Sequence, residues 1–375
     1  MLFRNRNWIE IDSLAAKSNA AAFRGLLGEK TKLWAVVKSN AYGHGLRQFA
    51  KIVNGGVNGF CVDTFIEGIK LRNAGIKKPI LVLGSTLPDL MKSAAHNNLI
   101  LSVSSWEALT AISKLKNPPD FHIKIDTGMH RQGFYPADVL KIIKIIGAPG
   151  SRTSRSFTGA YTHFASAKSF SESDRAYTDG QFEKFRCALR AFYNAGFKNL
   201  TAHCAATGAA LLHAKYHMDA VRVGIGLYGL YPSKEFARAA SNLNLKPVLS
   251  WRALVMETKP VKKGAGVGYD LTEKFKRNGK IAVLPIGYWH GLPRALSSAG
   301  EALINGRRAR ILGRVSMDLV VLDASKIPVS VMDVATLIGK DGRDAVSAWE
   351  MAEKAKTTAY EIIARINPTI ERRVV

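Results

Sequence analysis

The sequence has few cysteines, no long apolar runs and a shortage of acidic side chains. Its three cysteines, Cys61, Cys187 and Cys204, are widely spaced and form no CxxC pair, which excludes a disulfide framework and a cysteine zinc site. No run of roughly 18 apolar residues occurs, so no helix is expected to cross a membrane. The start of the chain, Met1–Asn7, lacks the apolar core of a signal peptide. These absences indicate a reduced, cytoplasmic protein.

The shortage of acidic residues is large, with 29 acidic against 54 basic side chains and a net charge of +25. Such an excess is also found in proteins that bind nucleic acid. Here it is spread evenly, because residues 1–240 carry 32 basic and 16 acidic side chains and residues 241–375 carry 22 and 13. Without a basic tail or arm, a solvated surface is the better interpretation, and we expect no nucleic-acid partner.

The first part of the chain alternates short apolar runs with longer amphipathic segments. Eight such runs and their intervening helical patterns predict a closed (β/α)₈ barrel, since a doubly wound sheet usually has fewer strands. Each run is short and apolar enough to be a strand buried on both faces. The expected strands are Leu33–Lys38, Gly59–Asp63, Pro79–Leu83, Leu99–Val103, Phe121–Asp126, Thr158–His163, Leu200–Cys204 and Ala220–Gly224.

After Tyr231-Pro232 the pattern changes to consecutive strands separated by glycine-containing turns. We therefore predict two domains, a barrel over residues 1–240 and a mainly antiparallel β domain over residues 241–375. The expected strands of the second domain are Val248–Thr258, Lys280–Gly287, Ala302–Ile304, Ala309–Leu312 and Val320–Asp323, followed by one helix over Ala348–Ile363.

Reactive side chains follow several of the predicted barrel strands, at the end where barrel enzymes have their active sites. Lys38 ends the first strand, while Thr207-Gly208 and Gly224-Ile225 follow the seventh and eighth and offer a hydroxyl and backbone N–H groups to an anion. Lys38 by itself could be an interfacial lysine whose amine reaches solvent. A lysine opposite a phosphate site, however, is what pyridoxal 5′-phosphate requires, because that cofactor forms a Schiff base and carries a phosphate.

Two weaker patterns are given less weight. Gly224–Gly229 formally matches GxGxxG, but the acidic residue expected about 20 positions later in a dinucleotide site is missing. His213 and His217 have a spacing that metal ligands use, but they lack the glutamate of HExxH, so we interpret them as a surface helix pair and expect no metal.

Longer motifs carry a resemblance that spans both predicted domains. The segment Ala35–Gly45, AVVKSNAYGHG, resembles the pyridoxal-phosphate attachment motif of the alanine racemases. Further segments resemble motifs of the same family in the same order: Lys124–Arg131, Tyr161–Ala165, Arg222–Gly229, Val267–Tyr269, Pro285–Tyr288 and Gly313–Asp318. The resemblance implies a pyridoxal-phosphate-dependent isomerase that interconverts L- and D-alanine and supplies the D-isomer for peptidoglycan precursors.

The resemblance also implies a role for each matching residue. Lys38 would hold the cofactor as an aldimine and act as the base on one face of the substrate, and Tyr269 would be the base on the other face. A free tyrosine has a pKa of about 10, so His163 and neighbouring cations would favour its phenolate. Arg222 would contact the pyridine nitrogen, Arg131 and Met317 the substrate, and Lys124 is at the position that is carbamylated in some members. The remaining cofactor contacts would be Tyr42, Thr207, Gly224 and Ile225, at the phosphate.

In this family Tyr269 and Met317 would come from the second subunit, so the resemblance implies a homodimer with shared active sites. Two departures stand out: Ala206 precedes Thr207 where the family usually has asparagine, and Pro368 replaces a tyrosine that narrows the pocket in many members. The second leaves open a racemase for serine or for several amino acids. A non-catalytic pyridoxal-phosphate-binding protein is less favoured, because proteins of that kind lack the β domain.

Overall fold

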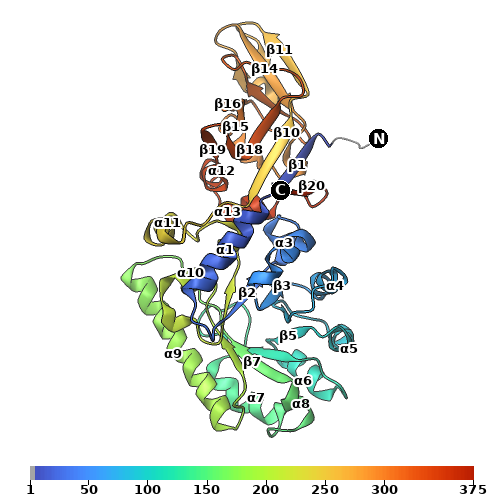
Figure 1. Cartoon of the computed structure of the whole chain (residues 1–375), viewed down its shortest axis with the longest axis vertical. Helices are drawn as coiled ribbons and strands as arrows, with labels where there is room; N and C mark the ends of the chain where they lie inside the picture. Colours follow the sequence, from blue (N-terminus) through green and yellow to red (C-terminus); the bar gives the residue numbers. More distant parts are fainter. Residues whose placement is uncertain (1–4) are drawn as a thin grey trace. The chain divides into compact units, whose positions relative to one another are not determined.

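The structure is a computed structural model that describes residues 5–375. Residues 1–4, part of the segment without a signal-peptide core, lie outside the described residues. The described chain divides into two compact units. The barrel unit consists of residues 14–39 and 49–246, and the β unit consists of residues 5–13, 40–48 and 247–375. The β unit therefore includes two segments from the N-terminal part of the chain. The first contains β1 (Asn7–Ile11), drawn in blue beside β10 (Leu249–Leu254) in Figure 1.

The barrel unit is built on a sheet of eight parallel strands, in the order β8-β7-β6-β5-β4-β3-β2-β9. An isolated parallel bridge between Ala206 and Arg222 links the segment after β8 to β9, which closes the sheet into a barrel. All eight predicted strands are confirmed. They are β2 (Lys32–Val36), β3 (Gly59–Val62), β4 (Ile80–Val82), β5 (Ile100–Val103), β6 (Phe121–Lys124), β7 (Phe157–Tyr161), β8 (Thr201–His203) and β9 (Ala220–Val223).

The barrel helices cover strands that are buried along nearly their whole length, as expected of parallel strands packed on both faces. Several helices begin at a serine or threonine whose side chain accepts a backbone N–H, which fixes the strand-to-helix turn; Ser105 and Ser171 do so. The helices of this part of the chain are α1 (Ser13–Leu26), α3 (Leu46–Val53), α4 (Phe65–Asn73), α5 (Met91–His96), α6 (Trp106–Lys114), α7 (Val139–Ile146), α8 (Arg152–Ser156), α9 (Glu172–Asn194), α10 (Thr207–Leu212) and α11 (Lys234–Ala239).

The β unit contains a mainly antiparallel sheet in the order β11-β14-β17-β16-β15-β18-β10-β1-β20, with β19 paired to β18. A separate two-stranded sheet pairs β12 with β13. The parallel pair β1–β20 is the exception to the antiparallel pattern. The strands are β1 (Asn7–Ile11), β10 (Leu249–Leu254), β11 (Glu257–Val261), β12 (Gly266–Val267), β13 (Glu273–Lys274), β14 (Gly279–Leu284), β15 (Glu301–Ile304), β16 (Arg307–Leu312), β17 (Val320–Asp323), β18 (Val334–Asp341), β19 (Asp344–Val346) and β20 (Glu371–Val374).

Two predictions for the β unit are wrong in detail. The single strand expected over Val248–Thr258 is two strands, because the chain changes partners at Val255: β10 pairs with β18, and β11 pairs with β14. The single helix expected over Ala348–Ile363 is also two, α12 (Ala348–Lys354) and α13 (Ala359–Ala364). Lys356 has a left-handed φ of 55°, and Thr358 caps a new helix with its hydroxyl.

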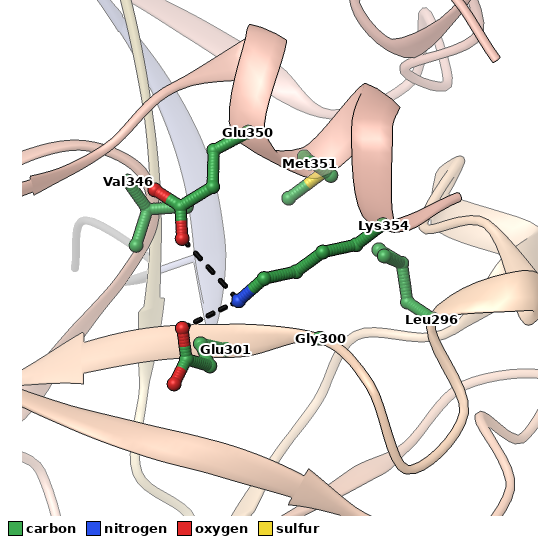
Figure 2. Close-up of a pocket in the computed structure, with 7 residues that line it drawn as sticks. All are labelled: Leu296, Gly300, Glu301, Val346, Glu350, Met351 and Lys354. Carbon is green, nitrogen blue, oxygen red and sulfur yellow. Dashed lines mark hydrogen bonds and ion pairs between the residues drawn. The ribbon is translucent and has the colours of Figure 1, made fainter. Parts of the chain in front are cut away.

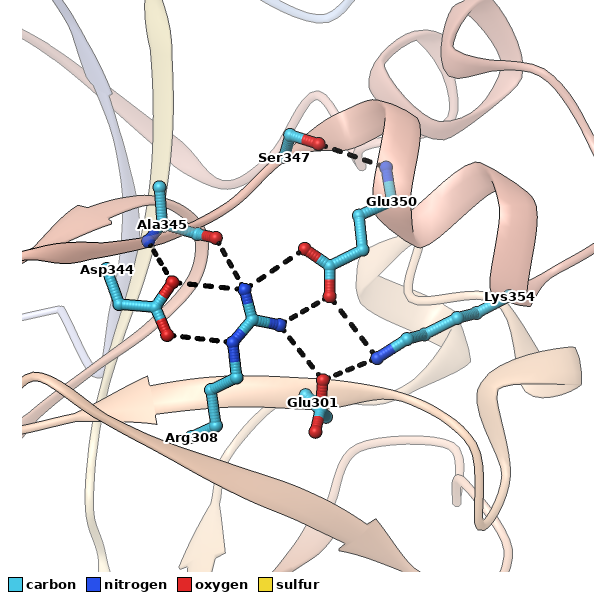
Figure 3. Close-up of polar contacts among 7 residues, drawn as sticks. All are labelled: Glu301, Arg308, Asp344, Ala345, Ser347, Glu350 and Lys354. Carbon is cyan, nitrogen blue, oxygen red and sulfur yellow. Dashed lines mark hydrogen bonds and ion pairs between the residues drawn. The ribbon is translucent and has the colours of Figure 1, made fainter.

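A network of ion pairs ties α12 to the strands of the β unit (Figure 3). Arg308 on β16 contacts Asp344 at 2.8 Å, Glu301 at 3.0 Å and Glu350 at 2.5 Å, and Lys354 contacts both glutamates. Figure 2 shows the cavity beside Lys354, Glu301 and Glu350, whose volume of about 10 Å³ is enough for no more than a water molecule. We therefore assign this cluster to the stability of the β unit rather than to substrate binding.

Three further findings concern the described residues as a whole. None of the helices in residues 5–375 is both long and apolar enough to cross a membrane. No cluster of three or more histidine, cysteine, aspartate or glutamate side chains in the same range could hold a metal ion. All three cysteines are free thiols, with Cys61 and Cys204 buried and Cys187 exposed.

Candidate active site

Lys38 follows β2 at the C-terminal end of the barrel, next to the ends of both neighbouring strands. β2 pairs with β9 on one side and with β3 on the other, so the segment after β3 lies beside Lys38. From that segment the Asp63 carboxylate contacts the Lys38 amine at 3.0 Å. Both side chains are partly exposed, so the amine remains accessible to a small molecule. Asp63 therefore supplies a counter-charge to the candidate nucleophile.

Glu67 connects the backbone on which these two side chains stand. One of its carboxylate oxygens accepts the Ser39 N–H at 2.7 Å, and the other accepts the Asp63 N–H at 2.8 Å. Glu67 is also the third residue of α4, where it forms a capping box with Thr64. One carboxylate thus fixes the ends of two adjacent strands and, with them, Lys38 and Asp63.

The backbone immediately after Lys38 is left-handed. The four residues that follow it, within the short helix α2 (Lys38–Tyr42), have φ values between 50° and 55°. A run of this kind is unfavourable for L-residues by roughly 1–2 kcal/mol each, so the surrounding structure must hold it in place. The next residue has to be glycine, because a Cβ on Gly43 would lie 1.9 Å from the Ile363 carbonyl oxygen. The run passes from the barrel unit, which ends at Ser39 here, into the β unit.

Arg222 is buried on β9, where its two terminal nitrogens are saturated with protein acceptors. One donates to His203 Nδ1 at 2.5 Å and to the His203 carbonyl at 3.1 Å. The other donates to the carbonyls of Thr162 at 2.8 Å and Cys204 at 3.2 Å. The Nε–H has no acceptor among residues 5–375, so one charged donor remains for a bound group.

The histidines around Arg222 are neutral at neutral pH. Burial, reinforced by the charge of Arg222, lowers the pKa of His163 to about 3. The same causes hold the pKa of His203 well below its usual range. Arg222 is therefore the cation of this group, and His163 Nδ1 lies 3.4 Å from its guanidinium as a neutral ring.

The predicted anion cradle is partly satisfied by its own hydrogen bonds. The Thr207 hydroxyl accepts the backbone N–H of Gly224 at 3.1 Å and lies 3.5 Å from that of Gly226, which joins the segments after β8 and β9. Ala206 occupies the N-cap position of α10 without a side-chain cap. Glycine is required after Thr207, since a Cβ on Gly208 would lie 1.9 Å from the Ala167 carbonyl oxygen.

The loop that carries Arg131 is shaped by one carboxylate. Asp126, at the end of β6, accepts the backbone N–H groups of the four residues from Gly128 to Arg131 at 2.9–3.1 Å. Burial alone would raise the pKa of Asp126, but these four donors together lower it. Asp126 therefore stays ionised and holds Arg131 at the barrel end.

Lys124, on the same strand, is buried and donates to Gln132 Oε1 at 3.1 Å. Burial lowers the pKa of Lys124 to about 8, and the charges of Arg131 and Arg222 add to this effect. A large fraction of its amine is therefore neutral in mildly alkaline solution.

Three predicted site residues belong to the β unit. Tyr42 lies in the segment 40–48, and its ring is 6.2 Å from that of Tyr360. Tyr269 follows β12 in a loop held by the ion pair between Asp270 and Arg314 at 2.6 Å. Met317 is on another loop of this unit. The side chains of Tyr269 and Met317 are 68% and 54% exposed, respectively.

The barrel unit thus brings together most of the predicted residues on the ends of its strands. They are Lys38, Lys124, Arg131, His163, Thr207, Arg222, Gly224 and Ile225. Tyr42, Tyr269 and Met317 are in the other unit. The catalytic and binding roles of all these residues stay predictions. Sequence reasoning missed Asp63, Glu67 and the buried pair His122 and His203. The signals that would have identified them are an acid directly after a strand and a histidine inside an apolar strand.

The interpretation of His213 and His217 as a surface helix pair is wrong. Helix α10 ends at Leu212, before either histidine. His213 Nδ1 accepts the Lys215 N–H at 3.0 Å, while His217 is buried and its Nε2 lies 2.8 Å from the Ala210 carbonyl oxygen. Both rings therefore make local contacts with the backbone.

Comparison with known proteins gives matches over nearly the entire chain. Residues 11–232 match the model of the alanine racemase N-terminal domain, and residues 248–374 match that of the C-terminal domain. An alanine racemase of Halothermothrix orenii is 38% identical over 371 residues, which is 97% of this chain and 96% of the relative. One of Methanococcus maripaludis is 37% identical, with 97% of each chain covered.

Solved structures agree with these matches. An alanine racemase from Bacillus anthracis with bound L-Ala-P superposes with a TM-score of 0.92 at 33% identity, covering 100% of this chain and 96% of that one. One from Streptomyces lavendulae, a producer of D-cycloserine, gives 0.91 at 30% identity, covering 100% and 98%. The eight-stranded barrel with its mainly antiparallel second unit is thus the fold of these proteins.

Proposed function

The chain belongs to the alanine racemase family, and from that premise we propose how its residues interconvert L- and D-alanine. The enzyme is an isomerase, as the family and the full-length similarity establish. One observation carries the assignment of the site. At the C-terminal end of the barrel an accessible lysine follows β2, a buried arginine lies on the neighbouring strand β9, and the Thr207 hydroxyl meets the backbone N–H of Gly224 after β9.

We propose pyridoxal 5′-phosphate as the cofactor, because the residues present fit it. Lys38 provides the amine for covalent attachment, and Thr207, Gly224 and Ile225, with Tyr42, provide the phosphate contacts. The Nε–H of Arg222 provides a donor to the ring nitrogen. When bound, the cofactor supplies a conjugated ring that stabilises the negative charge left on Cα after a proton is removed.

Racemisation removes the Cα proton from one face and returns one to the other, and a proton acceptor on each face of Cα is the simplest arrangement that does this. In this chain the Lys38 amine would take or return the proton on one face and the Tyr269 hydroxyl on the other. Arg222 cannot readily give up a proton, so it leaves the ring nitrogen unprotonated and favours return of the proton over side reactions. Arg131 suits the substrate carboxylate because its planar cation matches an anionic group, and Met317 would line the substrate.

We propose that the active enzyme is a cytoplasmic homodimer that provides D-alanine for peptidoglycan precursors. The exposure of Tyr269 and Met317 supports the dimer, since a second subunit could cover both. Each copy would then supply these two residues to the barrel end of its partner.

The substrate assignment is tested with the purified protein loaded with pyridoxal phosphate. We expect absorbance from covalently attached cofactor and racemisation of L-alanine, with serine slower by about 10–100-fold, since a pocket for a methyl group rejects an added hydroxyl only weakly. Chiral chromatography of L-alanine and L-serine incubated side by side measures both rates. A preference for serine would overturn the alanine assignment and give a role to Pro368, and absence of any racemisation would favour a cofactor-binding protein.

We also propose that Lys124 is carbamylated. Only a neutral amine adds carbon dioxide, and because the pKa of Lys124 is lowered to about 8, the reactive form increases as the pH rises through 8 and is lost below it. The resulting anion would attract the nearby Arg131 guanidinium and hold it for the substrate.

Native mass spectrometry at pH 8–9 should therefore show one added carbon dioxide that disappears on acidification. Lys124→Met should abolish this mass and raise the KM for alanine by roughly tenfold, equivalent to about 1.4 kcal/mol. The exposed Lys168→Met serves as the control and should retain both properties. An unmodified wild-type protein at pH 9 would contradict the proposal.

A further inference from the structure

A chain of hydrogen bonds runs inward from Arg222 through two histidines in the interior of the barrel. Arg222 donates to His203 Nδ1 at 2.5 Å, and His203 Nε2 lies 2.8 Å from His122 Nδ1. The three side chains come from β9, β8 and β6, and each residue is at most 2% exposed. Nothing in the proposed reaction uses His122, yet it is joined to the cation of the site through one intermediate ring.

The positions of the protons along these hydrogen bonds follow from the chemistry of Arg222. A guanidinium only donates, so His203 Nδ1 must be the acceptor. A neutral imidazole has one N–H, which His203 must therefore carry on Nε2. That N–H donates to His122 Nδ1, so His122 in turn carries its proton on Nε2. Both rings are neutral, because burial lowers the pKa of His122 to about 3 and that of His203 well below its usual range.

Aromatic packing holds both rings in this arrangement. Trp34 stacks on His122 with centroids 5.7 Å apart, and Tyr161 stacks on His203 at 4.8 Å with an interplanar angle of 4°. Gly159 makes room for the first ring, since a Cβ there would lie 2.6 Å from His122 Nε2. Neither ring can turn over without displacing a neighbour, so the tautomers are determined by the hydrogen bonds.

We propose that His122 is a positioning residue for the racemase site: it fixes the tautomer of His203 and thereby the orientation in which Arg222 presents its remaining Nε–H. This inference rests on the proposed function for the consequence to catalysis, but the tautomer itself does not depend on it. Without an acceptor at position 122, the buried His203 N–H is unsatisfied. Moving that proton to Nδ1 would direct an N–H at the guanidinium and displace Arg222.

The chain offers a matched pair of variants at this position. His122→Asn places an amide oxygen near the position of the imidazole Nδ1 and keeps the acceptor, whereas His122→Leu keeps an apolar side chain and removes it. Ser102→Ala is the control, because it deletes a buried hydrogen bond of the same barrel, to the Tyr161 hydroxyl at 2.9 Å, without contacting either histidine through its hydroxyl.

The first measurement is the nitrogen NMR spectrum of ¹⁵N-histidine-labelled protein, which reports the tautomer whether or not the enzyme turns over. Wild type, His122→Asn and Ser102→Ala should show His203 protonated on Nε2, and His122→Leu should not. A wild-type His203 protonated on Nδ1, or an unchanged His203 signal in His122→Leu, would overturn the proposal.

The second measurement uses the enzyme loaded with pyridoxal phosphate. His122→Leu should shift the absorbance band of the bound cofactor and lower kcat by roughly 10–100-fold, as expected for a misplaced catalytic group, with little change in KM. His122→Asn should retain most of the wild-type kcat and nearly the wild-type position of the absorbance band. Equal losses in the two variants would show that the ring only fills space and would overturn the proposal.

The two proposals fail in distinguishable ways. If wild type binds no cofactor or racemises nothing, the proposed function fails, while the NMR result still decides the role of His122. If His122→Leu does not fold, His122→Gln is measured in its place, because the glutamine amide oxygen lies nearer the position of the imidazole Nε2 than that of Nδ1. A His203 tautomer and a kcat equal to those of wild type in His122→Gln would count against the inference.

Discussion

Tyr269→Phe should reduce alanine racemisation by about 10²–10⁴-fold, the usual contribution of a positioned proton donor or acceptor. The substitution removes only the hydroxyl, and the ion pair between Asp270 and Arg314 that holds the loop does not involve it. The loss in kcat/KM must be equal for both enantiomers, because the equilibrium constant between them is unaffected by the enzyme. Cofactor absorbance should be unchanged, since Lys38 is intact.

Hydrogen exchange in deuterium oxide distinguishes a two-base reaction more specifically. With Lys38 still present, the Cα proton of one enantiomer should continue to exchange with solvent without inversion, while exchange of the other should be lost. Proton NMR of D- and L-alanine incubated separately measures this. Tyr193→Phe, a partly exposed tyrosine of the barrel unit, is the control and should retain both activities. Loss of exchange for both enantiomers would instead point to a structural role, and full racemisation would remove Tyr269 from the mechanism.

Lys38→Ala is expected to have the other large effect, because it removes both the amine that attaches the cofactor and one of the two bases. Racemisation should fall by at least about 10³-fold, and borohydride reduction should no longer link the cofactor to the protein. The measurements are the chiral assay and the mass of the reduced protein.

Two companion variants separate chemistry from charge. Lys38→Arg keeps a cation beside Asp63 but cannot form the covalent link, so it should be as inactive as Lys38→Ala. Lys32→Ala removes an exposed lysine from the start of the same strand, β2, and should be fully active. Substantial activity in Lys38→Arg would show that the positive charge, not the nucleophilic amine, is what the site requires.

The barrel could be predicted because its strands are recognisable one at a time. Runs such as Gly59–Val62 and Ala220–Val223 are short, apolar and buried along their length, so local composition is enough to identify them. The strands of the β unit were harder to predict from the sequence. Its strands β1 and β20 carry charged residues and gain their partners from distant segments, so no local pattern indicated them.

The candidate site divides in the same way. Lys38, Arg222 and Thr207 lie at or just after the ends of predicted strands, and the topology of a barrel alone brings such positions to one end. Asp63 and Glu67 contact Lys38 and Ser39 at the end of the neighbouring strand. These contacts depend on the register between β2 and β3, which the sequence does not show. The neutral state of His163 could not be inferred either, because its pKa is set by burial beside Arg222.

The sequence by itself determined the family, the eight strands and the residue types that the reaction needs, because these are encoded in contiguous motifs and in local periodicity. Only the tertiary structure decided that residues 5–13 and 40–48 belong to the β unit, that a left-handed turn follows Lys38, and that His122 and His203 stand behind Arg222. The physical reason is the same in each case. Hydrogen bonds and burial between residues far apart in the chain set backbone conformation, tautomer and charge, and a linear pattern does not contain those distances.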